Sequence, residues 1–322
     1  MKKKIISLIG VSLAAIVLAS CGKNQNKSDD NNEDAINDSY KLKIVCPNGA
    51  PIIGIAEAAS YYKNNVNDEN IGVQPSTLSG FFNAGDADII IAPVNLGTKL
   101  YNEETSLYQI AGILTWGNTY FASGNTTFTI NDINGSNITM FGQNSITEKT
   151  ANYVLTQKGI TPSNKEFLGS AKLTADYLRN NQNSIVMTAE PELAAIKAAN
   201  SNIKAFSVND LYKEITSFDM PQAAVFVDPD VVKDHKELLN AFLKKIDDTD
   251  SLCESNPRDV AVKSISLGYG NEGEENIIAA GIPTSKVNYK KASDSKSELN
   301  KMIELFAPLF GSKTPNDEFY YQ

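Results

Sequence analysis

The chain has 322 residues, of which 42% are hydrophobic, and its 29 basic and 38 acidic residues give a formal net charge of −9. This length favours two compact lobes of about 100–200 residues each, and the apolar content excludes a chain that is disordered throughout. Only two basic residues are arginine, Arg179 and Arg258, so the composition excludes an ordinary nucleic-acid-binding surface. The single histidine, His235, excludes multi-histidine metal sites and leaves a Ser-His-Asp arrangement one candidate base.

The N-terminus has the pattern of a bacterial export signal. Three lysines at positions 2–4 precede an apolar stretch, Ile5–Ala19, that is shorter than the ~20 residues needed to span a bilayer. The stretch ends in small residues before a cysteine, Leu18-Ala19-Ser20-Cys21, and so resembles a lipobox. We predict a signal peptide at residues 1–20 and diacylation of Cys21, whose two acyl chains would anchor the protein durably. The alternative is ordinary signal cleavage beside an incidental cysteine.

The segment that follows lacks the composition of a folded region. Between Gly22 and Ser39 only Ala35 and Ile36 are apolar, so the segment cannot bury enough surface to offset the entropy of ordering. We predict a disordered tether at residues 21–40. It would hold the folded part close to the extracytoplasmic face of a bacterial cell membrane.

From Tyr40 onward, short β-branched runs alternate with helical patterns, which is typical of βαβ units. The run Ala87–Ala92 (ADIIIA) is continuously apolar, as expected of a buried parallel strand. In this first block we predict strands at 41–46, 71–74, 87–92 and 108–114 and helices at 51–63 and 93–101.

The pattern restarts after Trp116–Tyr120, where the chain should cross to a second lobe. In this block we predict strands at 137–141, near Phe167, at 185–188 and at 203–206, and helices at 147–158, 173–179 and 191–199. An apolar strand then follows at 223–227, and Asp228-Pro229 begins a helix that reaches about Ile246. The remainder is read as helices, near 258–267 and 298–309, joined by loops.

Three loops at the carboxyl ends of predicted strands are rich in small or polar residues and lead towards a helix: Asn48–Pro51, Ser76–Gly80 and Gly142–Thr147. Open α/β sheets bind ligands beyond the carboxyl ends of their strands, where helix N-termini present free N–H groups. The alternative is that these loops are good turns and caps with no ligand.

Five further residues bear on function, and two of them each allow two interpretations. Trp116 could stack on a ligand or pack between lobes, and Glu190 could face the crevice or complement a helix N-terminus. His235 is predicted to be packed or half-exposed beside an apolar helical stripe. An exported protein can form a disulfide, but we predict that Cys46 and Cys253 are unpaired small hydrophobic residues.

No phosphate-binding loop, zinc-ligand spacing, GxSxG or dinucleotide glycine motif is present. We therefore predict no catalytic residues, no metal site and no cofactor.

The run Gly85–Leu96 resembles the GxxDIxxxPxxL segment of ABC-importer solute-binding proteins of the nitrate, sulfonate, taurine and thiamine-precursor class. Other segments agree with the same family in the same order, over about residues 41–265: Pro47–Pro51, Thr115–Asn118, Phe141–Ser145, Glu190-Pro191 and Pro221–Ala223. This ordered set is specific to the family and not to a ligand.

The resemblance implies an α/β, two-lobed type II periplasmic-binding-protein fold with two crossover hinge strands, in which hinge closure traps a ligand. Lobe 1 would comprise residues 41–118 plus 224–322, and lobe 2 residues 119–223. Positions carried over from the family as ligand-binding residues are Gly49, Ala50, Ser79, Asn95, Trp116, Gln143, Asn144, Ser145 and Glu190.

The implied function is that of a membrane-tethered, monomeric solute receptor that delivers its ligand to the permease subunits of an ABC importer. Alternatives are an adhesin or sensor protein on the same fold, or a lipid-anchored enzyme, and fold alone does not separate these. One enzyme relative, a pyrimidine synthase of thiamine biosynthesis, uses a histidine and a cysteine-rich motif that have no counterpart in these loops.

The loops suggest the chemistry of the ligand. They contain no Lys or Arg to grip a strong anion, whereas Trp116 and Glu190 would suit a ring that is neutral or weakly cationic. We therefore favour a ring-containing vitamin precursor over a sulfonate or nitrate-type anion, which helix N-termini could still bind.

Overall fold

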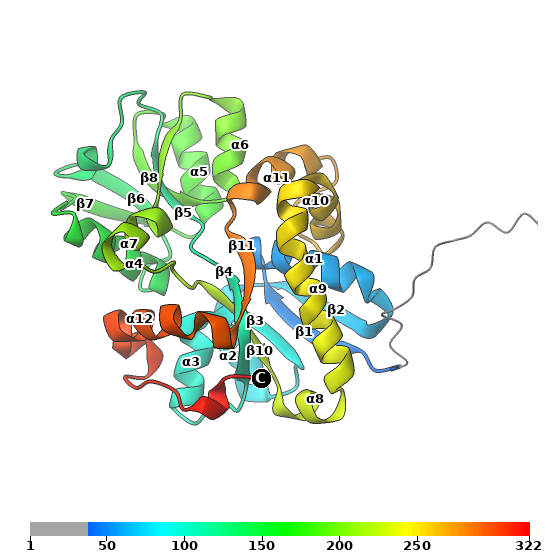
Figure 1. The fold of residues 1–322 in the computed structure, drawn as a ribbon. Helices are drawn as coiled ribbons and strands as arrows, with labels where there is room; N and C mark the ends of the chain where they lie inside the picture. The colour runs from blue at the N-terminus through cyan, green and yellow to red at the C-terminus, as the bar shows by residue number, and fades with distance from the viewer. Residues whose placement is uncertain (1–37) are drawn as a thin grey trace, which may run out of the picture. The chain divides into compact units, whose positions relative to one another are not determined.

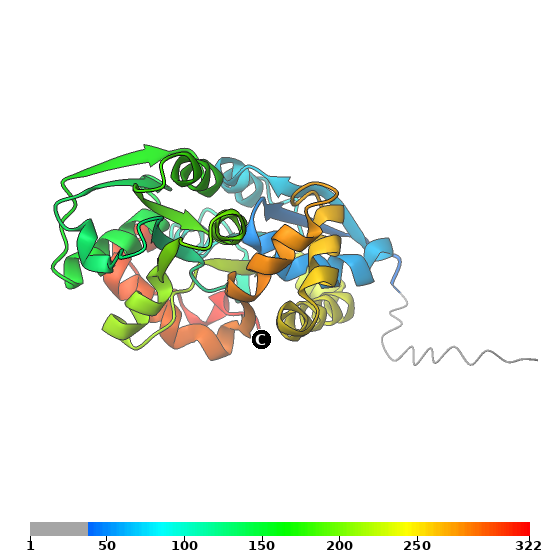
Figure 2. The same cartoon turned by 90° about the horizontal axis from the view of Figure 1, so that it is seen from above.

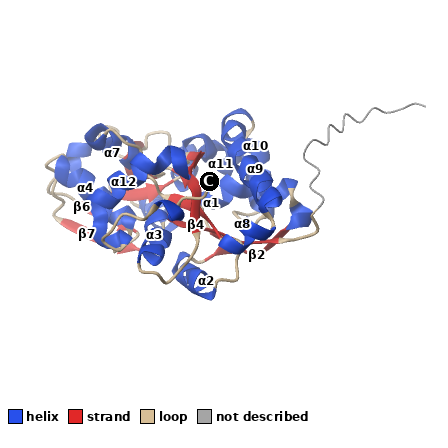
Figure 3. Cartoon of the chain, turned by 60° about the horizontal axis from the view of Figure 1, so that its bottom comes forward, coloured by secondary structure: helices blue, strands red, loops and turns tan. Residues whose placement is uncertain are grey.

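The computed structural model describes residues 38–322. The predicted signal peptide, the lipidation site Cys21 and most of the tether lie outside the described residues. All described residues belong to one compact unit, in which helices surround two separate β-sheets (Figures 1 and 3).

The larger sheet has six strands in the order β11-β4-β10-β3-β1-β2, and we call it, with the helices packed on it, lobe 1. Strand β1 is parallel to both β2 and β3, whereas β10 is antiparallel to β3 and β4. The strands are β1 (Leu42–Pro47), β2 (Val66–Val73), β3 (Ile89–Pro93), β4 (Gln109–Thr115), β10 (Ala223–Val227) and β11 (Val287–Lys291). The helices are α1 (Ala50–Tyr61), α2 (Leu78–Ala84), α3 (Val94–Asn102), α8 (Pro229–Asp234), α9 (Lys236–Ser255), α10 (Pro257–Ser266), α11 (Glu275–Gly281) and α12 (Lys296–Phe306).

The smaller sheet has five strands in the order β7-β6-β8-β5-β9, and we call it, with its helices, lobe 2. Its strands are β5 (Thr119–Ser123), β6 (Asn137–Phe141), β7 (Asn164–Leu168), β8 (Ile185–Ala189) and β9 (Lys204–Ser207). Its helices are α4 (Ile146–Gln157), α5 (Ala171–Asn180), α6 (Glu192–Ala199) and α7 (Val208–Thr216).

The chain crosses between the sheets twice. Residues 116–118 lead from β4 into β5, and residues 217–222 lead from α7 back into β10. The predicted α/β fold, with two lobes and two crossovers, is confirmed.

The position of strand β3 between helices on both faces of the sheet explains why its sequence is continuously apolar. Ile89 and Ile91 belong to a core cluster that includes α1, α9 and α10, whereas Ile90 and Ala92 belong to another that includes α2 and α12. Because successive side chains point to opposite faces, a strand covered by helices on both sides has no solvent-facing position.

Several elements differ from the sequence prediction. The helix expected from 229 to about 246 is two helices, α8 and α9, because His235 between them adopts non-helical backbone angles. The region read as loops after 267 contains α11 and the edge strand β11, whose half-exposed Asn288 and Lys290 hide its apolar alternation. Strand β5 and helices α2 and α7 were also not predicted.

His235 is half-buried, as predicted, at the point where the chain enters lobe 1. Its Nδ1 lies 2.8 Å from a carboxylate oxygen of Asp38, and its ring stacks on Tyr40 with 3.7 Å between centroids. Hydrogen bonding to His235 is the main cause that lowers the pKa of Asp38. Cys46 and Cys253 are both buried and free, so the prediction that they are unpaired is confirmed.

Candidate functional site

Each sheet contains a point where the helices after two adjacent parallel strands leave towards opposite faces. In lobe 1, β1 is followed by α1 on one core cluster and β3 by α3 on the other. In lobe 2, β6 and β8 are followed by α4 and α6, which also pack into different clusters. Such topological switch points leave a crevice beyond the strand ends, where α/β proteins bind ligands.

Most of the sequence-predicted binding residues lie at these places. Gly49, Ala50 and Asn95 follow β1 and β3, and Trp116 begins the first crossover. Four residues follow β6 and β8 in lobe 2: Gln143, Asn144, Ser145 and Glu190. Ser79 is the exception, because it is an exposed residue of α2 that follows the edge strand β2.

The lobe 1 switch point offers two helix N-termini without acidic neighbours. Gly49 precedes α1 with φ 123°, a conformation that favours glycine, and supplies no capping side chain. Neither α1 nor α3 has an acidic residue in its first turn. Their N–H groups therefore carry uncompensated partial positive charge.

The matching helix in lobe 2 is different. Glu148 lies in the first turn of α4, and its carboxylate accepts a hydrogen bond from the backbone N–H of Asn144. This carboxylate already complements the helix N-terminus, so α4 is a poor site for an anion. Gln143 and Asn144 are exposed, and the Ser145 hydroxyl donates to the carbonyl of Gly142.

Two buried polar atoms in this region have no hydrogen-bond partner within the protein. They are Oδ1 of Asn95, at the start of α3, and Oγ1 of Thr119, the first residue of β5. A buried polar atom without a partner is costly, and binding sites are one place where this cost is tolerated. Asn95 is among the residues predicted from the sequence, whereas Thr119 is not, and its place directly after the crossover is the one signal that the sequence offers for it.

Trp116 is packed against strand β11. It is 4% exposed, its Nε1 donates to the carbonyl of Asn288 at 2.6 Å, and the Lys290 ammonium lies 4.6 Å from its ring centroid. These contacts join Trp116 to a strand of lobe 1, so neither of its two interpretations, stacking on a ligand or packing between lobes, is decided by them. Lys290, on the unpredicted strand β11, also brings a cation to the crossover that the loop sequences did not reveal.

Glu190 is also held by the protein itself. One carboxylate oxygen accepts from the backbone N–H of Ala194 in α6, and the other accepts from the hydroxyl of Thr284, both at 2.8 Å. Burial raises the pKa of this carboxyl, and the two hydrogen bonds oppose that shift. The helix-N-terminus interpretation is therefore supported, with an added contact to Thr284 that no sequence pattern indicated.

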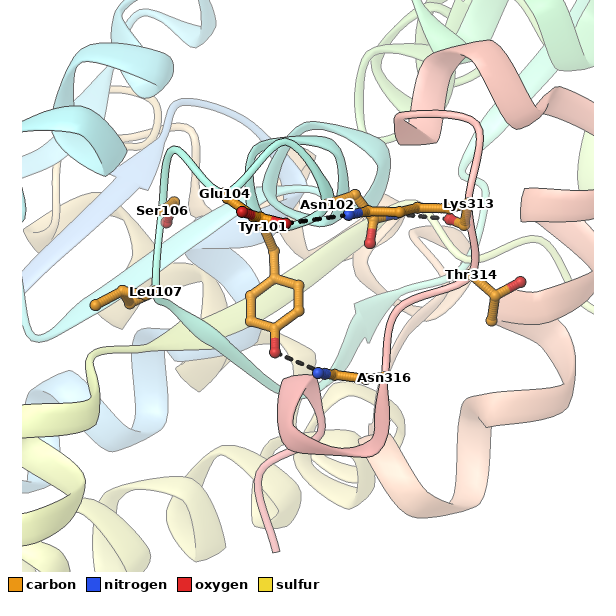
Figure 4. Close-up of a pocket in the computed structure, with 8 residues that line it drawn as sticks. All are labelled: Tyr101, Asn102, Glu104, Ser106, Leu107, Lys313, Thr314 and Asn316. Atoms are coloured by element: carbon orange, nitrogen blue, oxygen red, sulfur yellow. Dashed lines mark hydrogen bonds and ion pairs between the residues drawn. The ribbon is translucent and has the colours of Figure 1, made fainter.

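A cavity of about 360 Å³ lies at the other end of α3, away from the switch point (Figure 4). The side-chain amide nitrogen of Asn102 donates there to the carbonyls of Phe310 and Lys313 at 2.6 and 2.7 Å. The hydroxyl of Tyr101 donates to Asn316. These bonds tie α3 to the C-terminal segment. The lining residues are Tyr101, Asn102, Glu104, Ser106, Leu107, Lys313, Thr314 and Asn316.

Within residues 38–322, no group of three or more His, Cys, Asp or Glu side chains is placed to hold a metal ion. None of the helices in this part of the chain combines the length and apolar character required to cross a membrane.

No protein-family model matches the sequence, and no curated protein matches it either. Solved structures do match in fold. An ABC transporter from Parabacteroides distasonis is 17% identical, with a TM-score of 0.72 over 88% of this chain and 99% of its own. The periplasmic aliphatic sulphonate binding protein of Escherichia coli is 11% identical, with a TM-score of 0.64 over 88% of this chain and 93% of its own.

Two further structural neighbours are of different kinds, one a component of an import system and the other an enzyme. The ligand binding component of an ABC-type import system from Staphylococcus aureus, solved with zinc bound, is 13% identical, with a TM-score of 0.61 over 88% of this chain and 96% of its own. A desulfurization enzyme is 12% identical, with a TM-score of 0.54 over 86% and 94% of the two chains. At these identities the likeness is one of fold: the chain has the two-lobed α/β fold of the periplasmic solute-binding proteins of ABC transporters.

Proposed function

We propose that this protein is the solute-binding component of an ABC importer, held at the extracytoplasmic face of the membrane through Cys21. The observation that carries this proposal is the pairing of two switch points, one in each sheet, with two chain crossings between the sheets. Two crossings form a hinge, and closure about a hinge traps a ligand between lobes. The partners would be a small solute and the permease subunits of the importer.

For the ligand, we favour a small ring-containing molecule, neutral or weakly cationic, such as a vitamin precursor. The switch-point loops contain neither Lys nor Arg, and Oδ1 of Asn95 is an unpaired acceptor suited to a ligand N–H. Glu190 no longer supports this preference, because Thr284 and Ala194 already use both of its carboxylate oxygens. A sulfonate or nitrate-type anion is the second candidate, supported by the N-termini of α1 and α3.

An enzymatic function has less support. Cys46 is fully buried, and burial raises its thiol pKa far above the ordinary value, so it is a poor nucleophile. His235 contacts Asp38 and Tyr40, near the start of β1, whereas the switch point lies at the other end of that strand. A six-residue strand separates these two places by about 20 Å.

An adhesin or sensor function would call for a large exposed apolar patch. Among residues 38–322, five large apolar side chains are exposed, and some apolar exposure is normal on a folded protein. These side chains are Tyr61, Leu107, Leu173, Val262 and Ile277.

A thermal-shift screen of the purified protein tests the proposed function. Candidate solutes are thiamine precursors, riboflavin, polyamines, sulfonates and nitrate. A true ligand at one hundred times its Kd should stabilise the protein by about 2.7 kcal/mol. We expect Asn95→Ala to raise the Kd of such a ligand roughly 3–10-fold, measured by calorimetry, because a buried hydrogen bond is lost.

Asn83→Ala is the matched control, since Asn83 is exposed in α2 away from the switch point. A ligand whose affinity is unchanged in Asn95→Ala would place its binding elsewhere. Catalytic turnover of a screened compound would replace the receptor proposal with the enzyme alternative.

The lipid anchor needs its own test. We expect Cys21→Ser to abolish incorporation of a labelled fatty acid and to release the protein into the medium or leave it as uncleaved precursor. Retention of the label in Cys21→Ser would contradict lipidation at this position.

A further inference from the structure

One segment after α11 lies beside the crossover and contacts lobe 2, although its strand β11 belongs to the sheet of lobe 1. The views in Figures 1 and 2 agree that α11 lies beside α6 of lobe 2, and β11 pairs with β4 next to the first crossover. Between α11 and β11, the backbone carbonyl of Lys286 accepts a hydrogen bond from the backbone N–H of Trp116. The ammonium of Lys286 lies 3.3 Å from a carboxylate oxygen of Asp210 in α7. We call residues 281–290 the strap.

Thr284 is the residue of the strap that makes the most specific contacts with lobe 2. Its hydroxyl donates to the carboxylate of Glu190 at 2.8 Å, and its backbone carbonyl accepts from the hydroxyl of Tyr120 at 2.9 Å. Both partners belong to the smaller sheet or to the turn that follows its strand β8. One residue is therefore bonded to two elements of the other lobe.

Glu190 is a fixed acceptor for this bond. Its backbone N–H donates to the carbonyl of Asn118 and its own carbonyl accepts from the amide of Asn118, both at 3.0 Å. Its second carboxylate oxygen is bonded to the N–H of Ala194. The carboxylate is thus oriented by the crossover on one side and by α6 on the other, so a change in the angle between lobes must stretch its bond to Thr284.

A close steric contact accompanies the hydrogen bonds. A Cβ atom added to Gly281 would lie 2.5 Å from Cβ of Pro191 and 3.1 Å from Cβ of Ala194. Only glycine at position 281 permits this approach without displacing one of the two lobes.

We propose that the bonds of Thr284 to Glu190 and Tyr120 form a latch that fixes the angle between the two lobes. Glu190 is then a positioning residue of the hinge and not a ligand contact. The further consequence, that the latch sets how readily the lobes separate to admit a solute, rests on the proposed function; the latch itself does not.

The test measures the distance between the lobes in the ligand-free protein. Spin labels are placed on exposed positions, Lys149→Cys in α4 and Glu237→Cys in α9, in the Cys21→Ser background, with the buried Cys46 and Cys253 left in place. A control protein that lacks the two new cysteines is treated with the same spin label, and it measures any labelling of Cys46 and Cys253. Pulsed electron resonance then gives the distribution of distances.

We expect Thr284→Val and Glu190→Ala to broaden this distribution, with a roughly tenfold larger population of altered distances, because a hydrogen bond to a charged group is lost. Glu190→Gln should restore the narrow distribution. Its amide can donate to the Thr284 hydroxyl, which can turn its own proton to the carbonyl of Gly281, 3.2 Å away.

Thr98→Val is the matched control, since its buried hydroxyl donates to the carbonyl of Val94 at 2.7 Å within α3, a helix of lobe 1. Unchanged distributions in both Thr284→Val and Glu190→Ala would overturn the latch. If Glu190→Ala does not fold, the exposed Thr284→Val decides alone. The distance measurement uses ligand-free protein, so a solute screen that finds no ligand does not affect it. If the screen finds a ligand but the distance distributions are unchanged, the latch is rejected and the receptor function is retained.

Discussion

Phe226→Ala is expected to lower the free energy of unfolding by about 3–5 kcal/mol, the range for removing a buried aromatic ring. Phe226 is fully buried in β10, the strand between β4 and β3. Its ring meets Phe82 edge-on at 5.3 Å between centroids and lies 6.3 Å from Phe319. It also fills the space that a side chain at Gly97 would need. Loss of this ring therefore leaves a cavity that the neighbouring elements cannot readily fill.

Denaturant unfolding followed by circular dichroism measures this loss. Leu107→Ala is the control, because Leu107 is 75% exposed and its truncation should change the free energy by less than about 0.5 kcal/mol. A loss under about 1 kcal/mol for Phe226→Ala would mean that the site collapses around the cavity. Since β10 begins directly after the return crossover, we also expect this variant to loosen lobe 1 where the hinge enters it.

Gly281→Val is expected to cost about 1–3 kcal/mol of stability through overpacking. The new side chain would overlap Pro191, including its backbone Cα, which would be 2.8 Å from the added Cβ. Because the backbone at Gly281 has φ −92°, which any residue adopts, the cost comes from the contact between lobes and not from local strain. The variant should therefore also shift the spin-label distance between α4 and α9.

Ala280→Val is the matched control for this second prediction. Ala280 is exposed one residue earlier in the same helix, so Ala280→Val introduces the same β-branched side chain without the steric contact. Denaturation and the interlobe distance are measured on both variants. Equal behaviour of the two would show that Pro191 gives way and that α11 does not constrain lobe 2.

The sequence by itself determined most elements of the two sheets. The strands predicted at 137–141 and 223–227 coincide with β6 and β10, and the ADIIIA run overlaps β3. These predictions succeed because the periodicity of apolar residues and the identity of turn and capping residues act over a few positions along the chain. The same local logic marked the loops after β1, β2 and β6. Topology brought the loops after β1 and β6 to the switch points, whereas β2 is an edge strand.

Elements with weak local signals were missed for a physical reason. Strand β11 is an edge strand of five residues with two lysines, and it is stabilised as a strand by pairing with β4, about 170 residues earlier in the sequence. At the break between α8 and α9, His235 likewise contacts Asp38 and Tyr40, which lie far from it in sequence.

Only the tertiary structure shows which groups the candidate site residues contact. Glu190 and Trp116 each allowed a ligand-binding interpretation, and their actual partners, Thr284 and Asn288, lie 94 and 172 residues away. Unsatisfied atoms such as Oγ1 of Thr119 can be recognised only when every neighbour is known. A local pattern specifies which face of an element is apolar, but a hydrogen bond between distant segments depends on how two lobes pack, and no stretch of sequence a few residues long contains that information.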